Sequence, residues 1–170
     1  METRILGTTE ADIRLAAEMI QKGGLVAFPT ETVYGLGADA LNAEAVGKVY
    51  AAKGRPSDNP MIVHIAQKSD MNKLTDGITP EVKRLMEAFW PGPLTMVVPA
   101  KDVIPKVTTG GLATVGVRMP EDAIARALIS AAGVPIAAPS ANLSGKPSPT
   151  LAEHVAFDMD GRIPMILDGG

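Results

Sequence analysis

The sequence predicts an α/β fold built on a twisted, open mixed sheet, with substantial parallel pairing between strands and helices on its flanks. Apolar runs of strand length alternate with amphipathic helical patterns along the 170 residues. The apolar runs are continuous, which indicates strands buried on both faces and favours parallel pairing. Because no repeat, linker or change in composition divides the chain, we expect a single domain over residues 1–170.

The first half of the chain is predicted to contain three helices and two strands. A helix over residues 9–22 is expected because Thr9 and Asp12 resemble a capping box and two glycines follow the helix. The other predicted elements are a strand at 25–28 that Pro29 ends, a helix at 43–52 that follows Asn42, a strand at 61–65, and a helix that starts at Pro80 and ends before Pro91.

The second half continues the alternation of strands and helices. Strands are predicted at 94–98 and 114–117, a helix at 121–132, a strand at 134–138, a helix at 150–158 and a strand at 165–167. Gly133 ends the first of these helices, and Pro139 ends the strand after it. A turn-like Asp-Gly-Gly segment follows the last strand directly, so we expect the domain to lack its final strand.

The composition excludes several classes of protein. The chain has no cysteine, which excludes disulfides, thiolate metal sites and a cysteine nucleophile and fits a cytoplasmic location. The formal net charge of −3 argues against a strongly basic nucleic-acid binder. No apolar run has the length of a membrane span, and no signal-peptide pattern is present, so we expect no membrane association. The sequence also contains no P-loop, dinucleotide-binding glycine fingerprint, H-E-x-x-H or G-x-S-x-G motif.

Two polar segments follow predicted strands, at positions where open α/β sheets bind ligands. Residues 29–37 supply threonines, a carboxylate and glycines, and residues 139–145 supply hydroxyl and amide groups. These groups could bind anionic oxygens through hydroxyls, backbone N–H groups or a close approach of the backbone. Ordinary turns with surface threonines, or a capping segment, would account for the same residues.

Positive charge is concentrated at two further places. Lys53 and Arg55 are expected on one tight loop after a helix, where they could hold phosphate or carboxylate, although a lysine there also compensates the helix dipole. Arg118 ends an apolar strand and requires a carboxylate partner, which is either a ligand or a structural Asp or Glu. We interpret His64 as a core or edge histidine and His154 as a surface residue.

In their order along the chain, the segments FPTETVYGLG, AAKGRPSDNPMIVHI, FWPGPLTMVV, VGVRMP and PSANLSGKPSPT resemble the Sua5/YrdC family. The resemblance covers nearly the whole chain and implies a YrdC-like catalytic domain with a positively lined cavity. It also implies a nucleotidyltransferase that makes threonylcarbamoyl-AMP from L-threonine, bicarbonate or CO2, and ATP with Mg²⁺, releasing pyrophosphate. Threonylcarbamoyl transferase proteins downstream would then place the t6A modification at position 37 of tRNA.

The resemblance assigns the nucleotide to four residues. Lys53 and Arg55 would be catalytic and, together with Ser140 and Asn142, would contact the nucleotide and the reacting groups. Catalysis of this kind depends on positioning the substrates and neutralising phosphate charge, because the substrate itself supplies the nucleophile. No metal ligand is expected from the protein side chains.

The resemblance assigns threonine to a second group of residues. Thr32, His64 and Arg118 match positions near the amino acid, and Arg118 would clamp its carboxylate. Relatives continue beyond the Asp-Gly-Gly segment with a strand that carries a Ser-Thr pair and then an arginine, which help to close the active site. We therefore expect a chain of this length to lack those groups.

Two other functions remain as alternatives. A non-catalytic module that binds double-stranded RNA or the ribosome would use a basic concave face, and weak binding of tRNA would follow from the same surface. The net charge of −3 weighs against this alternative, because binding to a phosphate backbone depends on many cations. The other alternative is carbamoyl-adenylate chemistry, as in hydrogenase-maturation proteins, but the cysteines of their zinc fingers are absent from this sequence.

Overall fold

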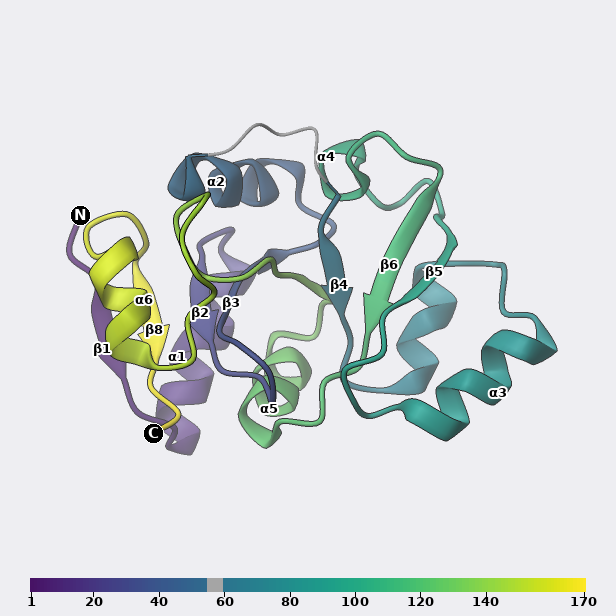
Figure 1. The fold of residues 1–170 in the computed structure, drawn as a ribbon, viewed down its shortest axis with the longest axis horizontal. Helices are drawn as coiled ribbons and strands as arrows, with labels where there is room; N and C mark the ends of the chain where they lie inside the picture. The colour runs from purple at the N-terminus through teal and green to yellow at the C-terminus, as the bar shows by residue number, and fades with distance from the viewer. Residues whose placement is uncertain (55–59) are drawn as a thin grey trace.

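The structure is a computed structural model in which residues 1–54 and 60–170 are described. It contains an eight-stranded sheet in the order β1-β8-β2-β3-β7-β4-β6-β5 (Figure 1). Strand pairs β1/β8, β2/β8 and β4/β6 are parallel and the other neighbouring pairs are antiparallel, which confirms the predicted mixed sheet. The strands are β1 (Arg4–Leu6), β2 (Val26–Phe28), β3 (Gly35–Asp39), β4 (Ile62–His64), β5 (Met96–Pro99), β6 (Thr114–Arg118), β7 (Ile136–Ala137) and β8 (Met165–Leu167).

Most helices begin and end at residues that the sequence marks. Thr9 and Asp12 form a capping box at α1, the side chain of Asn42 caps α2, and Pro80 occupies the first turn of α3. Glycines in the left-handed conformation end α2 and α5. Within the described ranges, none of the helices is long and apolar enough to cross a bilayer. The helices are α1 (Glu10–Gln21), α2 (Ala43–Lys53), the 3-10 helix η1 (Lys68–Lys73), α3 (Pro80–Phe89), α4 (Lys106–Thr109), α5 (Ala123–Ala132) and α6 (Ala152–Met159).

The structure adds β1, β3, η1 and α4 to the predicted elements. Strand β3 begins inside the segment 29–37 that was expected to be a loop, and its sequence Gly-Leu-Gly-Ala-Asp lacks the β-branched residues that usually indicate a strand. A Cβ added to Gly37 would lie 2.8 Å from Ile136 Cγ2 and 2.8 Å from Phe28 Cε1. Gly37 therefore permits close packing inside the sheet, and not the approach of a ligand as expected.

Both faces of the sheet are covered around β2 and β8. Val26 and Phe28 belong to a core cluster with α1 and α5, whereas Ala27 belongs to a second cluster with α2 and α6. Helices α1 and α5 also pack directly against each other. This arrangement explains why the strand sequences are apolar at consecutive positions.

The register of β4 and β6 separates core residues from site residues. Val63 pairs with Val117, and both valines are buried in the core cluster on one face. His64 pairs with Arg118 one position further, so their side chains point to the opposite face. On that face Ile62 of β4 remains partly exposed to solvent. This half of the sheet forms the floor of a cavity.

Candidate functional site

A cavity of about 270 Å³ lies at the carboxyl ends of β4 and β6, the usual place for ligands in open α/β sheets. Its walls come from the loop before β3, from residues 93 and 95 ahead of β5, and from the segment 138–140 after β7. Four residues predicted from the sequence line the cavity: Thr32, His64, Arg118 and Ser140. The fold thus brings them together from four separate segments of the chain.

Arg118 is buried, and its guanidinium contacts three protein groups. Nε donates to Gly92 O at 3.2 Å, and one terminal nitrogen donates to Thr32 Oγ1 at 3.3 Å. The other terminal nitrogen lies 2.6 Å from Glu31 Oε1, an ion pair that is not aligned as a hydrogen bond. The structural salt bridge that the sequence left open for Arg118 is therefore present.

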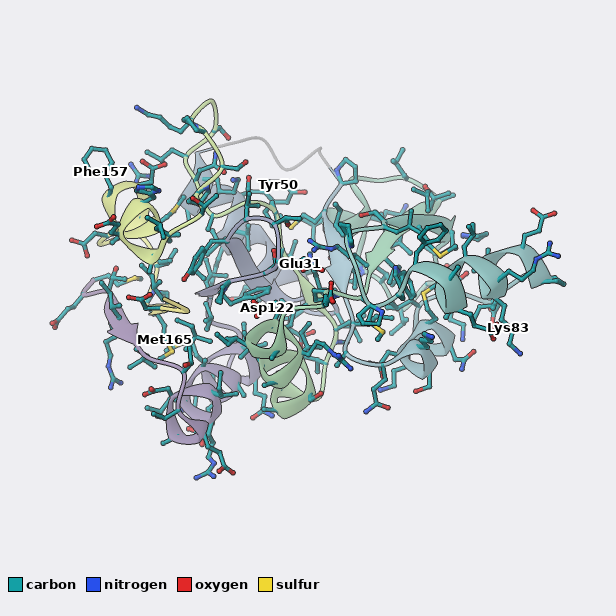
Figure 2. The ribbon with its side chains drawn as sticks, turned by 60° about the horizontal axis from the view of Figure 1, so that its bottom comes forward. Glu31, Tyr50, Lys83, Asp122, Phe157 and Met165 are labelled. Carbon is teal, nitrogen blue, oxygen red and sulfur yellow. The ribbon has the colours of Figure 1, made fainter. Side chains whose placement is uncertain are left out.

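Glu31 is the part of the site that sequence reasoning missed. Its Oε2 accepts a hydrogen bond from the backbone N–H of Glu121 at 2.8 Å, so the carboxylate connects Arg118 to the start of α5. Figure 2 shows Glu31 near the middle of the molecule, close to Asp122. Burial alone would raise the pKa of Glu31, but backbone hydrogen bonds, above all that from Glu121, and the charge of Arg118 hold the pKa below its usual value. The carboxylate therefore stays ionised at neutral pH.

A short chain of hydroxyl groups orients Thr32. Thr30 Oγ1 donates to Val33 O at 2.7 Å, and the hydroxyls of Thr30 and Thr32 lie 3.0 Å apart. Because the single hydroxyl proton of Thr30 is used, Thr32 donates to Thr30 and accepts from Arg118. The predicted threonine-binding residues Thr32 and Arg118 are thus in direct contact.

His64 is buried against the cavity and is neutral. Its ring meets the ring of Phe28 edge-on, with 6.2 Å between the ring centroids. Burial, and then the positive charge of Arg118, lowers the pKa of His64 to about 4. In the part of the chain that the structure describes, Nδ1 has no hydrogen-bond partner. His64 is therefore both a buried histidine, as expected, and a residue of the site.

Lys53 is buried, whereas the sequence predicted it on a loop. It is the last residue of α2, only 3% exposed, and its ammonium donates to Ser140 O and, at 2.7 Å, to Asn142 O. The ammonium therefore fixes the segment 140–142 through the carbonyl oxygens of Ser140 and Asn142. The other predicted cation, Arg55, lies outside the described residues.

In the loop after β7, several backbone N–H groups donate to carbonyl oxygens of the protein. Ala141 N–H donates to Tyr34 O, Asn142 N–H to Ser140 O and Ser144 N–H to Lys53 O, at 2.9 to 3.0 Å. The N–H groups of Ala141, Asn142 and Ser144 are therefore already paired with carbonyl oxygens of the protein. The side chain of Asn142 donates to two carbonyl oxygens, and its Oδ1 has no partner among the described residues. Among the side chains of this loop, Ser140 lines the cavity.

Tyr34 joins three segments around the cavity. Its carbonyl accepts from Ala141, its N–H donates to Pro149 O at 2.8 Å, and its hydroxyl accepts from Gly169 N–H at 2.9 Å. The hydroxyl is partly shielded from solvent, and burial raises its pKa. No sequence signal could have found these contacts, because all three partners are distant along the chain.

The described residues contain no group of three or more His, Asp or Glu side chains that could hold a metal ion. A hard cation such as Mg²⁺ is often bound largely by substrate phosphates, with few protein ligands. The donor set of the cavity, a guanidinium, hydroxyl groups and a neutral imidazole, is suited to carboxylate and phosphate oxygens.

The family model for Sua5, YciO and YrdC proteins, described as "Telomere recombination", matches residues 18–170. Threonylcarbamoyl-AMP synthase of Bacillus subtilis is 58% identical over 166 residues, which are 97% of this chain and 48% of that protein. Threonylcarbamoyl-AMP synthase of Halorhodospira halophila is 36% identical over 96% of this chain and 87% of that protein. The chain thus spans about half the length of the Bacillus relative and most of the Halorhodospira relative.

The fold is also similar to solved structures. The crystal structure of Sua5 from Pyrococcus abyssi in complex with L-threonine superposes with a TM-score of 0.95 and 54% identity. The alignment covers 100% of this chain and 51% of that one.

Proposed function

The chain belongs to the Sua5/YciO/YrdC family, and we propose that it catalyses ATP-dependent synthesis of threonylcarbamoyl-AMP from L-threonine and bicarbonate or CO2, with release of pyrophosphate. The observation that carries the proposal is the cavity in which a buried arginine, several hydroxyl-bearing residues and a neutral histidine meet. This set can bind carboxylate and phosphate oxygens. Binding and orienting these oxygens is the main task of the protein in this reaction, because the substrate supplies the nucleophile.

Arg118, Thr32 and His64 bind threonine in this proposal. The guanidinium carries five N–H donors, and the three protein contacts leave donors for a carboxylate. Glu31 and Gly92 fix the plane of the guanidinium, so little entropy is lost when a second carboxylate binds. The neutral imidazole of His64 adds no charge that would compete with Arg118.

Ser140, Asn142, Lys53 and Arg55 serve the nucleotide in this proposal. Ser140 lines the cavity and offers a hydroxyl to phosphate oxygen. Lys53 contributes indirectly. Its ammonium binds the carbonyl oxygens of Ser140 and Asn142 and so positions the loop that carries their side chains. The assignment of Arg55 rests on the K-x-R pattern alone.

The reaction proceeds in two steps. The neutral amine of threonine attacks CO2, a new N–C bond forms, and a proton leaves to solvent. An oxygen of the resulting carbamate then attacks the α-phosphorus of ATP, and the bond from that phosphorus to the pyrophosphate oxygen breaks. The enzyme's part is to align the carbamate with the α-phosphate and to stabilise the charge on the phosphate oxygens.

Mg²⁺ would enter with ATP, bound mainly to phosphate oxygens. The reaction is a nucleotidyl transfer, so we assign the protein to that class. Its product would be passed to threonylcarbamoyl transferase proteins that modify tRNA in the cytoplasm, and weak binding of tRNA would assist the transfer.

A single incubation tests the proposal. The protein is mixed with ATP, Mg²⁺, L-threonine and bicarbonate, and the adenylate is sought by mass spectrometry while pyrophosphate is assayed. Product is expected only when all substrates are present, and Arg118→Ala should abolish it. Salt-sensitive binding of double-stranded RNA, with neither adenylate nor pyrophosphate formed, would favour the non-catalytic alternative.

A further inference from the structure

A second cavity, of about 400 Å³, lies where α2 meets the segments that lead into β2 and β8. In Figure 1, α2 and the yellow loop before β8 lie together at the upper left, whereas β4 and β6 lie further to the right. The described residues that line this cavity are all different from those that line the candidate site. We call it the α2 cavity, and the residues that matter here are Leu25, Lys48, Ala51, Ala52, Arg162 and Pro164.

The wall of the α2 cavity is largely apolar. Leu25 and Ala52 are buried members of the main core cluster, and Ala51 and Pro164 continue the apolar surface towards solvent. The volume lies within the roughly 300–1,000 Å³ that small-molecule sites usually occupy. A ligand with an apolar body would therefore be stabilised by removing this wall from water.

Two exposed cations line the same cavity. Lys48 Nζ donates to Gly23 O at 3.2 Å, and Arg162 Nη1 donates to Ala52 O at 3.4 Å. An ammonium has three N–H donors and a guanidinium has five, so a single bond to a carbonyl leaves donors on both side chains. Within the described ranges neither cation forms an ion pair, although Glu44 lies one helical turn before Lys48 on α2. The charge of the α2 cavity is therefore complementary to an anion.

We propose that the α2 cavity binds a small organic anion with an apolar body, of the class of a medium-chain carboxylate. The carboxylate accepts hydrogen bonds from Lys48 and Arg162, and the apolar chain covers Leu25, Ala51 and Ala52. Both parts of the ligand are needed, because an exposed ion pair alone contributes little in water and an apolar molecule alone leaves the two cations without a counter-charge. The inference does not rest on the proposed function, because the two cavities have no lining residue in common.

Three probes separate the charge from the apolar chain: octanoate below its micellar concentration, 1-octanol and inorganic phosphate. In calorimetry, octanoate should bind the wild type at least about tenfold more tightly than either of the others. Lys48→Gln and Arg162→Gln should each weaken octanoate binding about threefold to tenfold and leave 1-octanol binding within about twofold. Lys83→Gln is the matched control, because it removes the same charge from α3, which lies far from Met165 of β8 (Figure 2).

Chemical shifts of the backbone amides locate the bound octanoate. The largest changes should centre on Leu25 and Ala52. Changes centred on Thr32 and Arg118 would place the probe in the candidate site and overturn the proposal, as would the absence of octanoate binding or equal affinity for octanoate and 1-octanol.

The variants give an independent decision. Unchanged octanoate affinity in both Lys48→Gln and Arg162→Gln would overturn the proposal, and so would an equal loss in Lys83→Gln. If Arg162→Gln fails to fold without its bond to Ala52 O, the exposed position of Lys48 still provides the test. A wild type that binds octanoate in the α2 cavity but forms no adenylate would refute the proposed function and leave this inference standing.

Discussion

Acidification should destabilise the protein through His64. The pKa of this histidine is lowered from 6.5 to about 4 in the folded state, so between these values the unfolded chain binds a proton that the folded protein does not. The contribution of neutral His64 to the free energy of unfolding is therefore fully present above the pKa of the unfolded state, 6.5, and is lost as the pH falls towards about 4. At about 1.4 kcal/mol per unit of pKa, the whole effect is roughly 3 kcal/mol. Between pH 7 and pH 5 the expected loss is about 2 kcal/mol.

Urea unfolding at pH 7, 6 and 5, followed by the fluorescence of the single tryptophan, Trp90, measures this loss. His64→Gln should remove most of the pH dependence, because its side chain stays neutral, even if the variant is less stable overall. His154→Gln is the matched control, since His154 is the other histidine and is exposed. The ionised Glu31 does not interfere, because its lowered pKa moves its contribution below pH 4.5. A wild-type loss below about 0.5 kcal/mol, or equal losses in wild type and His64→Gln, would refute the reasoning.

Three further substitutions test the site and the sheet. Arg118→Lys should weaken threonine binding at least tenfold in calorimetry and leave ATP within about threefold, because a lysine cannot present the paired N–H donors of a guanidinium; a larger loss for ATP would move Arg118 to the nucleotide site. Lys53→Met should lower the free energy of unfolding by about 2–3 kcal/mol, because the carbonyls of Ser140 and Asn142 lose their charged donor. Hydrogen exchange of the Ser144 amide should become faster, because this amide donates to Lys53 O in the same loop. Unchanged exchange would contradict the idea that the ammonium of Lys53 holds the loop in place. Gly37→Ala should lower the free energy of unfolding by about 1–3 kcal/mol, because the added Cβ would collide with packed side chains. Gly47→Ala is the control and should raise it by about 0.5–1 kcal/mol, because the space around this Cβ on α2 is open. Similar melting temperatures for the two variants would refute the packing argument.

Much of the fold could be predicted because local signals and tertiary structure agree. The caps at Thr9, Asn42 and Thr79 mark helix starts, and continuous apolar runs mark strands with two buried faces. Strand β3 could not be predicted in this way, because its glycines are selected by neighbours such as Phe28 and Ile136 that come from other strands. Strand β1 has only three residues, too few for a periodic pattern.

The candidate site could be predicted in its residue types and only partly in its contacts. Arg118 was expected to need a carboxylate, but which carboxylate depends on a loop that lies 87 positions earlier in the chain, at Glu31. Lys53 was expected on a loop after a helix, whereas it is the last residue of α2 and its ammonium is surrounded by the carbonyls of the segment 140–142. Contacts of this kind are set by the fold and leave no trace in local sequence.

The pairing of β4 with β6 links the candidate site to the register of the sheet. Neighbouring residues on these strands point in opposite directions, since Val63 and Val117 fill the core while His64 and Arg118 line the cavity. A slip of either strand by one position would bury a guanidinium or an imidazole in the core and expose a valine. A misregistered molecule would therefore be unstable, and quality control could remove it as unfolded protein. The protein is thus protected from accumulating a well-folded but inactive population.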